Sequence, residues 1–226
     1  ELTLIGEQGL ADYFLIVADI AAFARRERLG SCGRGSSANS LVVWLLGLTE
    51  VDPVRNGLWF DRFLHHGRLD FPDVDLDFAW DERDRVLSHV LNRWGRDRVA
   101  MISTHATFAR RGAVREAALA LGLPQGEVEA FRRRWRPDRP APEEPWARVV
   151  RMAEALKGFP RHVGVHPGGT VVAPSPLTDH LPLQHARKHV EGRPVTVTQW
   201  DMGPVEEAGL LKIDLLGNRG LAVIRD

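Results

Sequence analysis

Cysteine is almost absent from the sequence, and long apolar runs are missing. The single cysteine, Cys32, excludes an internal disulfide bond, which is compatible with a reducing compartment. The longest apolar run, residues 41–48, is far shorter than the roughly 20 residues that span a bilayer, and no basic-then-apolar leader opens the sequence. We therefore expect a cytoplasmic chain that makes no membrane contact.

The sequence also lacks net charge. Thirty basic and thirty acidic residues balance, so the overall charge gives no support for nucleic-acid binding. Lysine is scarce, and arginines gather in residues 110–115 and 132–136. Arginine forms bidentate contacts with phosphate, but from composition alone a solvated helix face is the better explanation of such clusters.

Hydrophobic spacing predicts both helices and strands. Apolar residues at helical intervals predict helices over 12–28, 81–94 and 110–121, and a buried helix over 41–48 that follows a glycine-rich turn at 30–35. Alternation predicts a strand over 69–78. The proline-rich stretch 136–145 is typical of an exposed connection. Short strands are expected after Phe159, over 169–173, 194–200 and 210–216.

The strand over 69–78 has an acidic face. Asp73, Asp75 and Asp77 point to one side, opposite Val74 and Leu76. Carboxylates this close repel each other, a cost that divalent cations among them would offset. A calcium-binding helix-loop-helix also begins Asp-x-Asp-x-Asp, but it needs glycine at the sixth position and glutamate at the twelfth, where this sequence has phenylalanine and aspartate. An acidic, solvent-facing strand edge remains the alternative.

A second strand carries Lys212 and Asp214 on one face. If the two acidic strands are neighbours, Asp73, Asp75 and Asp214 form a three-carboxylate site for two Mg²⁺ ions, as in in-line phosphoryl transfer. The alternative is that Asp214 simply pairs with Lys212.

Two further motifs are weaker. The loop 33–38 fits G-x-G-x-x-A, but a dinucleotide site needs a preceding strand, and here the sequence predicts a preceding helix. Gly35 and Ser36 still allow close backbone approach of a phosphate to a helix N-terminus, although an ordinary helix cap is as good an explanation. His162 and His166 have the spacing of a helical zinc pair, but the glycines around them disfavour a helix.

Together these segments resemble the C-family bacterial DNA polymerases, the polymerase III alpha family. The match includes GRGSSANS at 33–40 and PDVDLDF at 72–78, and it continues in the family's order through residues 13–17, 47–49 with 52–53, 60–64, 168–169, 198–201 and 211–217.

The resemblance implies an α+β fold. A palm related to the polymerase β nucleotidyltransferases, a mixed β-sheet with flanking helices, would occupy residues 1–104 and 162–226, with a helical thumb inserted at 105–161. It also implies roles for individual residues. The metal ligands would be Asp73, Asp75 and Asp214, with Asp77 nearby but secondary, and the ions would be two Mg²⁺, for which Mn²⁺ can substitute. The triphosphate would be bound by Gly35, Ser36, Arg62, Arg68 and Lys212.

The implied function is template-directed DNA synthesis from deoxynucleoside triphosphates on primer-template DNA. The alternatives are a catalytically silent palm that serves as a scaffold or accessory subunit, and a two-metal phosphodiesterase. Residues 36–40 and 158–162 look more like the error-prone branch of the family. A sliding clamp and other replisome or damage-tolerance subunits would bind through family regions absent from this sequence, and the fragment alone is expected to extend a primer little.

Overall fold

The computed structural model describes residues 1–67, 71–136 and 142–226. Two compact units make up the chain. The first joins Glu1–Thr104 to Val165–Asp226, and the second is His105–Gly164. The second unit covers the stretch 105–161 in which an insertion is expected from the sequence.

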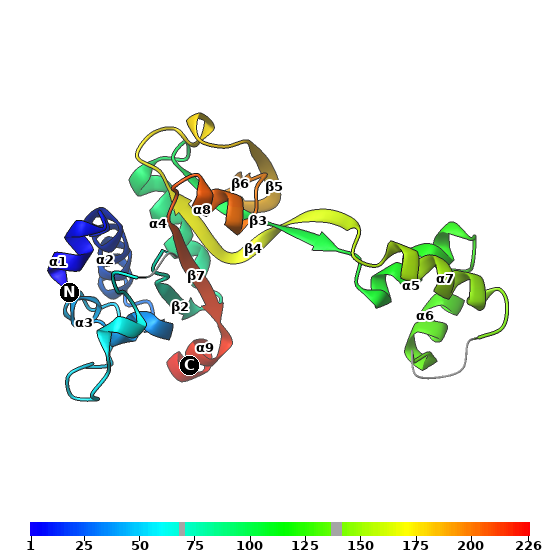
Figure 1. The fold of residues 1–226 in the computed structure, drawn as a ribbon, viewed down its shortest axis with the longest axis horizontal. Coiled ribbons are helices and arrows are strands. Elements are labelled where there is room, and N and C mark those ends of the chain that lie inside the picture. The colour runs from blue at the N-terminus through cyan, green and yellow to red at the C-terminus, as the bar shows by residue number, and fades with distance from the viewer. Residues whose placement is uncertain (68–70, 137–141) are drawn as a thin grey trace. The chain divides into compact units, whose positions relative to one another are not determined.

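A mixed β-sheet is the framework of the first unit. Seven strands within the described ranges pair in the order β1-β2-β7-β4-β3-β6-β5 (Figure 1). Strand β2 runs parallel to β7, whereas β1 and β4 run antiparallel to β2 and β7 respectively. The strands are β1 (Ser31–Arg34), β2 (Asp75–Ala79), β3 (Val99–Thr107), β4 (Pro160–Val172), β5 (Leu183–Val190), β6 (Arg193–Thr198) and β7 (Lys212–Asn218).

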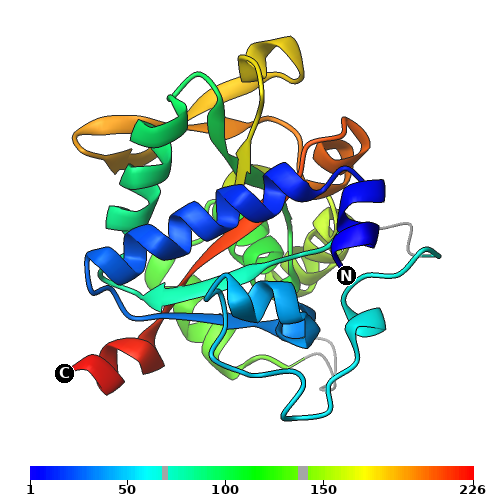
Figure 2. The same cartoon turned by 90° about the vertical axis from the view of Figure 1, so that its left-hand side faces the viewer.

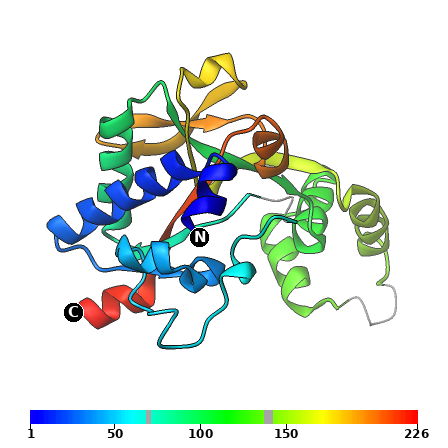
Figure 3. The ribbon, with the colours of Figure 1, turned by 60° about the vertical axis from the view of Figure 1, so that its left-hand side comes forward.

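Helices flank this sheet. Helix α2 lies across one face of it (Figure 2), and α9 continues directly from the end of β7 (Figure 3). None of the helices in the described part of the chain is long and apolar enough to cross a membrane. The helices of the first unit are α1 (Leu2–Glu7), α2 (Ala11–Arg26), α3 (Leu41–Leu45), α4 (Arg83–Trp94), α8 (Met202–Glu207) and α9 (Arg219–Arg225).

The alternation of strand side chains divides the buried core between the two faces of the sheet. Val99 and Met101 of β3 belong to the larger cluster, together with residues of α2 and α4. Ala100 and Ile102 belong to a smaller cluster that includes Val205 of α8. Because neighbouring side chains of a strand point to opposite faces, each face has its own apolar layer. Leu76 of β2 lies in the larger cluster, so the carboxylates next to it face away from α2.

The second unit has a separate small core. Its helices are α5 (Arg110–Ala120), α6 (Gln125–Arg134) and α7 (Trp146–Leu156). Alanines such as Ala113 and Ala117 are fully buried and allow the helices to approach closely. The ring of Phe131 stacks on Trp146 at 4.0 Å and on Trp135 at 5.8 Å between centroids. Such stacked aromatic pairs stabilise a small core beyond the area they bury.

The region around the glycine-rich loop differs from the sequence prediction. The prediction of a turn over 30–35 is wrong for most of that range, because Ser31–Arg34 form β1 and hydrogen-bond to β2. The buried helix over 41–48 is also wrong in extent. Helix α3 ends at Leu45, which is exposed, and Val43 is its one fully buried residue. Gly47, at φ +70°, then turns the chain in a conformation that favours glycine.

The strand predictions were incomplete as well. Strand β2 begins at Asp75, so a strand over 69–78 is too long, and residues 69–70 lie outside the described residues. Strand β4 extends over Pro160–Val172 where only 169–173 was predicted. Strands β3 and β5 were not predicted. In β5 half of the residues are exposed and only Val190 is buried, so the apolar alternation that signals a strand is weak there.

The packing of β1 predicts a sharp difference between two glycines. A Cβ at Gly33 would lie 2.1 Å from the carbonyl oxygen of Leu48, which is backbone and cannot rotate away, whereas a Cβ at Gly30 would meet nothing within 4 Å. We expect Gly33→Ala to lower the free energy of unfolding by about 1–3 kcal/mol, as overpacking does. Gly30→Ala is the matched control and should change it by less than about 0.5 kcal/mol. Urea denaturation of both variants measures this, and equal stabilities would contradict the packing of β1 against Leu48.

Candidate active site

Three aspartates meet on the face of the sheet opposite α2. The parallel pairing of β2 with β7 sets Asp75 beside Asp214. Asp73, two residues before Asp75, points to the same side. One carboxylate oxygen from each residue lies within 4.8 Å of the other two. The structure therefore brings together the three aspartates that the sequence motifs select, from segments about 140 residues apart in the chain.

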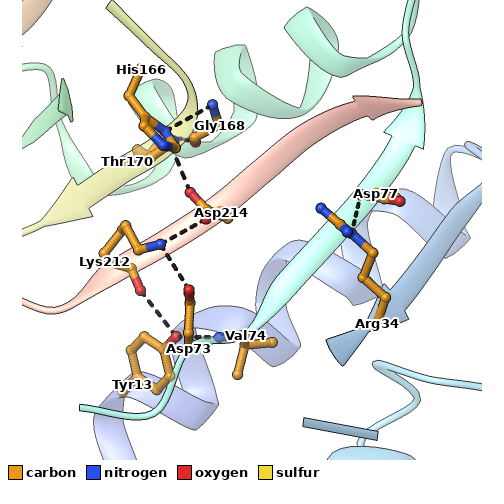
Figure 4. Close-up of polar contacts among 11 residues, drawn as sticks. Tyr13, Arg34, Asp73, Val74, Asp77, His166, Gly168, Thr170, Lys212 and Asp214 are labelled. Carbon is orange, nitrogen blue, oxygen red and sulfur yellow. Dashed lines mark hydrogen bonds and ion pairs between the residues drawn. The ribbon is translucent and has the colours of Figure 1, made fainter. Parts of the chain in front are cut away.

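Lys212 lies inside this acidic cluster. Its Nζ donates to Asp73 Oδ2 at 2.8 Å and to Asp214 Oδ2 at 2.7 Å (Figure 4). Burial disfavours the charge on Lys212, but the hydrogen bonds with Asp214 and Asp73 outweigh burial and raise the pKa of the ammonium group. The sequence offered two alternatives for Asp214: an ion pair with Lys212, or a place in a three-carboxylate cluster. The structure has both in the same site.

The cluster keeps more negative than positive charge. Burial, together with the charges of Asp73 and Asp214, raises the pKa of Asp75 to about 6. Among the described residues, Asp73 Oδ1 and Asp214 Oδ1 are buried and have no hydrogen-bond partner. Buried oxygens without partners are costly in a folded protein. Hard carboxylate oxygens are the ligands that Mg²⁺ and Mn²⁺ prefer, so the residues present fit divalent cations.

Tyr13 joins the two segments that carry the carboxylates. Its hydroxyl donates to the carbonyl of Lys212 at 3.0 Å and accepts the N–H of Val74 at 3.1 Å. Burial raises the pKa of Tyr13, so the phenol stays protonated and can donate. Sequence reasoning gave this residue no role of its own. The available signal was a lone tyrosine on the apolar face of a helix, because a buried phenol needs a hydrogen-bond partner.

The other neighbour of β7 is β4, in which Gly169 pairs with Asp214. His166 Nδ1 accepts the N–H groups of Gly168 at 3.2 Å and Gly169 at 2.6 Å, and lies 3.7 Å from Asp214 Oδ1. A Cβ at Gly168 would come within 2.5 Å of Leu216 Cδ2 and 3.3 Å of Asp214 Oδ1. A larger residue at this position would therefore require the Leu216 side chain to shift and would crowd Asp214 Oδ1. The whole 162–166 segment lies in β4, so the helical geometry that a zinc pair at this spacing needs is not formed.

The glycine-rich loop approaches the cluster from β1. Gly35 has φ +80°, and a Cβ there would lie 3.4 Å from Asp75 Oδ2. Ser36 lies in the first turn of a 3-10 helix, Gly35–Asn39. The helix predicted over 12–28 is present as α2, but the short strand β1 follows it and leads into the loop, and the sequence did not predict this strand. The expected α-helical N-terminus at Ser36 is likewise replaced by a short 3-10 turn.

The remaining candidates have other partners, are exposed, or lie outside the described residues. Asp77 is engaged by Arg34 Nε at 3.0 Å and by Asn218 Nδ2 at 2.8 Å. Arg62 is exposed in the 3-10 turn Phe60–Arg62, and within the described ranges no hydrogen bond or ion pair joins it to the cluster. Arg68 is outside the described residues.

Comparison with known proteins gives consistent matches. Residues 1–217 match the family model described as the bacterial DNA polymerase III alpha NTPase domain. The chain is 43% identical to the error-prone DNA polymerase of Pseudomonas paraeruginosa, over 100% of this chain and 23% of that protein. It is 43% identical to the error-prone DNA polymerase of Corynebacterium efficiens, over 96% of this chain and 19% of that protein. It is 40% identical to the DNA polymerase III subunit alpha of Thermus aquaticus, over 99% of this chain and 20% of that protein.

The chain thus spans about a fifth of the length of the curated relatives it matches. The family match covers nearly all of the chain and includes the segments that carry Asp73, Asp75 and Asp214. This chain belongs to the bacterial DNA polymerase III alpha family.

Proposed function

We propose that the unit formed by Glu1–Thr104 and Val165–Asp226 is the catalytic palm of a DNA-directed DNA polymerase. It would catalyse nucleotidyl transfer from a deoxynucleoside triphosphate to a primer 3′-hydroxyl, and it would be related in fold to the polymerase β nucleotidyltransferases. One observation carries the proposal. Asp73, Asp75 and Asp214 converge with two buried oxygens that have no partner among the described residues. Family membership and the names of the relatives support the same activity.

The three aspartates would hold two Mg²⁺ ions, or Mn²⁺ in their place. When bound there, the ions would act as Lewis acids that lower the pKa of the primer hydroxyl and neutralise charge on the phosphates. Two features favour such occupants: Asp73 Oδ1 and Asp214 Oδ1 are unpaired among the described residues, and burial together with repulsion by Asp73 and Asp214 raises the pKa of Asp75. Lys212 keeps a positive charge at the same site, which suits it to contact the triphosphate.

The glycine-rich loop would bind the triphosphate beside the carboxylates. Gly35 approaches Asp75 closely, and its positive φ is readily adopted by glycine. Backbone N–H groups at the start of the 3-10 turn, including that of Ser36, would then face phosphate oxygens. Arg62 and Arg68 complete the proposed set of triphosphate-binding residues.

The second unit, His105–Gly164, would be the thumb that contacts primer-template DNA. A pocket of about 250 Å³ in this unit is lined by Val114, Trp135 and four arginines, Arg110, Arg111, Arg132 and Arg136. Arginine side chains gathered in this way suit phosphate oxygens. The sliding clamp and other replisome or damage-tolerance subunits would bind to parts of the relatives that this chain does not match.

The first prediction separates metal-binding from structural aspartates. We expect Asp75→Asn to abolish detectable Mn²⁺ binding by the chain, and to reduce primer extension at least about 100-fold in a full-length polymerase that contains it. Asp77→Asn is the matched control, because Asp77 is engaged by Arg34 and Asn218. It should keep Mn²⁺ affinity within about threefold. Isothermal titration and primer-extension assays measure the two effects. Full activity of Asp75→Asn would show that primer extension does not depend on this cluster and would contradict the proposed catalytic site.

The second prediction concerns pH. The pKa of Asp75 is about 6 in the folded chain against an ordinary 3.8, so the folded state binds this proton more tightly than the unfolded state. The resulting stabilisation is fully present below pH 3.8 and is lost as pH rises through 6. Metal-free chain should therefore lose stability from about pH 4 to 6 relative to Asp75→Asn, while Mn²⁺ affinity rises over the same interval. Thermal melts with and without Mn²⁺ test this, and parallel pH profiles for the parent chain and the variant would contradict it.

The third prediction concerns DNA. Arg111→Ala combined with Arg136→Ala should weaken binding of a primer-template duplex and reduce the slope of log affinity against log salt by about 1 for each phosphate that is no longer neutralised. Arg151→Ala is the control, because Arg151 is exposed in the same unit and pairs with Glu144 at 3.0 Å. Fluorescence anisotropy from about 50 to 200 mM salt measures the slope. Identical slopes for the parent chain and both variants would show that the arginine pocket does not contact the duplex.

A further inference from the structure

His166 lies beside the acidic cluster without belonging to it. The proposed palm chemistry assigns it no role, and the zinc-pair interpretation of the sequence does not apply to a strand. Its ring is partly exposed, with 26% of the side-chain surface accessible, whereas the side chain of Asp214 is 9% accessible. The two side chains come within 3.7 Å, between His166 Nδ1 and Asp214 Oδ1.

The hydrogen bonds define what His166 does in this position. Nδ1 accepts two backbone N–H groups, from Gly168 and Gly169. A ring nitrogen that accepts N–H carries no proton, so the proton of the neutral ring is on Nε2. Nδ1 therefore has no hydrogen to give to Asp214 Oδ1, and the two atoms face each other as acceptors.

The same hydrogen bonds occupy two backbone donors of β4 beside Asp214. Gly169 is the strand partner of Asp214, and a Cβ at Gly168 would lie 3.3 Å from Asp214 Oδ1. The N–H groups of both glycines are directed to His166, and Figure 4 shows Gly168 beside the ring. Asp214 Oδ1 is buried and has no hydrogen-bond partner among the described residues.

From this geometry we infer that His166 is a positioning residue. It binds the N–H groups of Gly168 and Gly169 through Nδ1 and so keeps Asp214 Oδ1 free to bind a divalent cation. This role requires a hydrogen-bond acceptor at the position of Nδ1, and it involves no proton transfer by the imidazole ring. The inference rests on the proposed metal site, and it adds a residue that contacts neither metal nor substrate. When His166 is removed, the glycine N–H groups are released beside Asp214 and compete with the cation for Oδ1.

A matched pair of substitutions tests the requirement for an acceptor. Asparagine places an amide oxygen where it can accept N–H groups two and three residues onward, much as Nδ1 does, whereas alanine cannot. We expect His166→Ala to weaken Mn²⁺ binding by the chain about 10-fold or more, in the range found for residues that orient metal ligands. His166→Asn should stay within about threefold of the parent chain. His162→Ala is the control, since His162 is an exposed histidine of the same strand.

The measurements are Mn²⁺ titration followed by electron paramagnetic resonance, and ¹⁵N chemical shifts of the His166 ring in the metal-free chain. The shifts should show an unprotonated Nδ1 and a protonated Nε2 at neutral pH. Three results would each overturn the role of His166 and leave the metal site in place. They are a parent-like Mn²⁺ affinity of His166→Ala, an affinity of His166→Asn as weak as that of His166→Ala, and a proton on Nδ1. Failure of the parent chain to bind Mn²⁺ would overturn the proposed metal site together with this inference.

Discussion

The parallel pairing of β2 with β7 is the contact on which the proposed site depends. It sets Asp75 directly beside Asp214 and forces like charges together in a partly buried place. That arrangement opposes folding unless charge is compensated. Lys212 compensates part of it by binding Asp73 and Asp214, and the remaining repulsion contributes to the raised pKa of Asp75. A site with charge left over after folding is suited to bind cations.

Neighbouring groups hold this repulsive arrangement in place. Tyr13 connects the backbone before β2 to the start of β7 from the apolar face of the sheet, so its hydroxyl leaves the carboxylates untouched. On the other side of β7, Gly168 and Gly169 allow β4 to approach, and His166 takes up their N–H groups. The helices α2 and α4 supply the apolar layer behind the sheet. The fold thus supports the acidic face with groups that do not neutralise it.

The sequence predicted the parts of this site that have a strong local pattern. The period-2 alternation around Asp75 and around Asp214 identified both acidic strands and the face that the carboxylates share. The sequence could not show that the two strands pair, because about 140 residues separate them and local patterns carry no information on pairing. The three-carboxylate site was therefore predicted only for the case that the strands are neighbours. Strand β1 was missed because Gly33, with Gly30 and Gly35 on either side of the strand, is typical of a turn, although Gly33 is required by the close approach of Leu48. The hydrogen bonds of Tyr13 and His166 were beyond prediction, since their partners are backbone groups placed by tertiary structure.

The central claim is that Asp73, Asp75 and Asp214 hold two divalent cations. A crystal of the chain soaked with Mn²⁺ and a deoxynucleoside triphosphate, with anomalous scattering recorded at the manganese edge, tests it most directly. The account predicts two anomalous peaks within the cluster, with Asp73 Oδ1 and Asp214 Oδ1 among the ligands, and the triphosphate against Gly35 and Ser36. Peaks elsewhere in the chain, or a cluster that binds no Mn²⁺ and keeps Lys212 between Asp73 and Asp214, would contradict it.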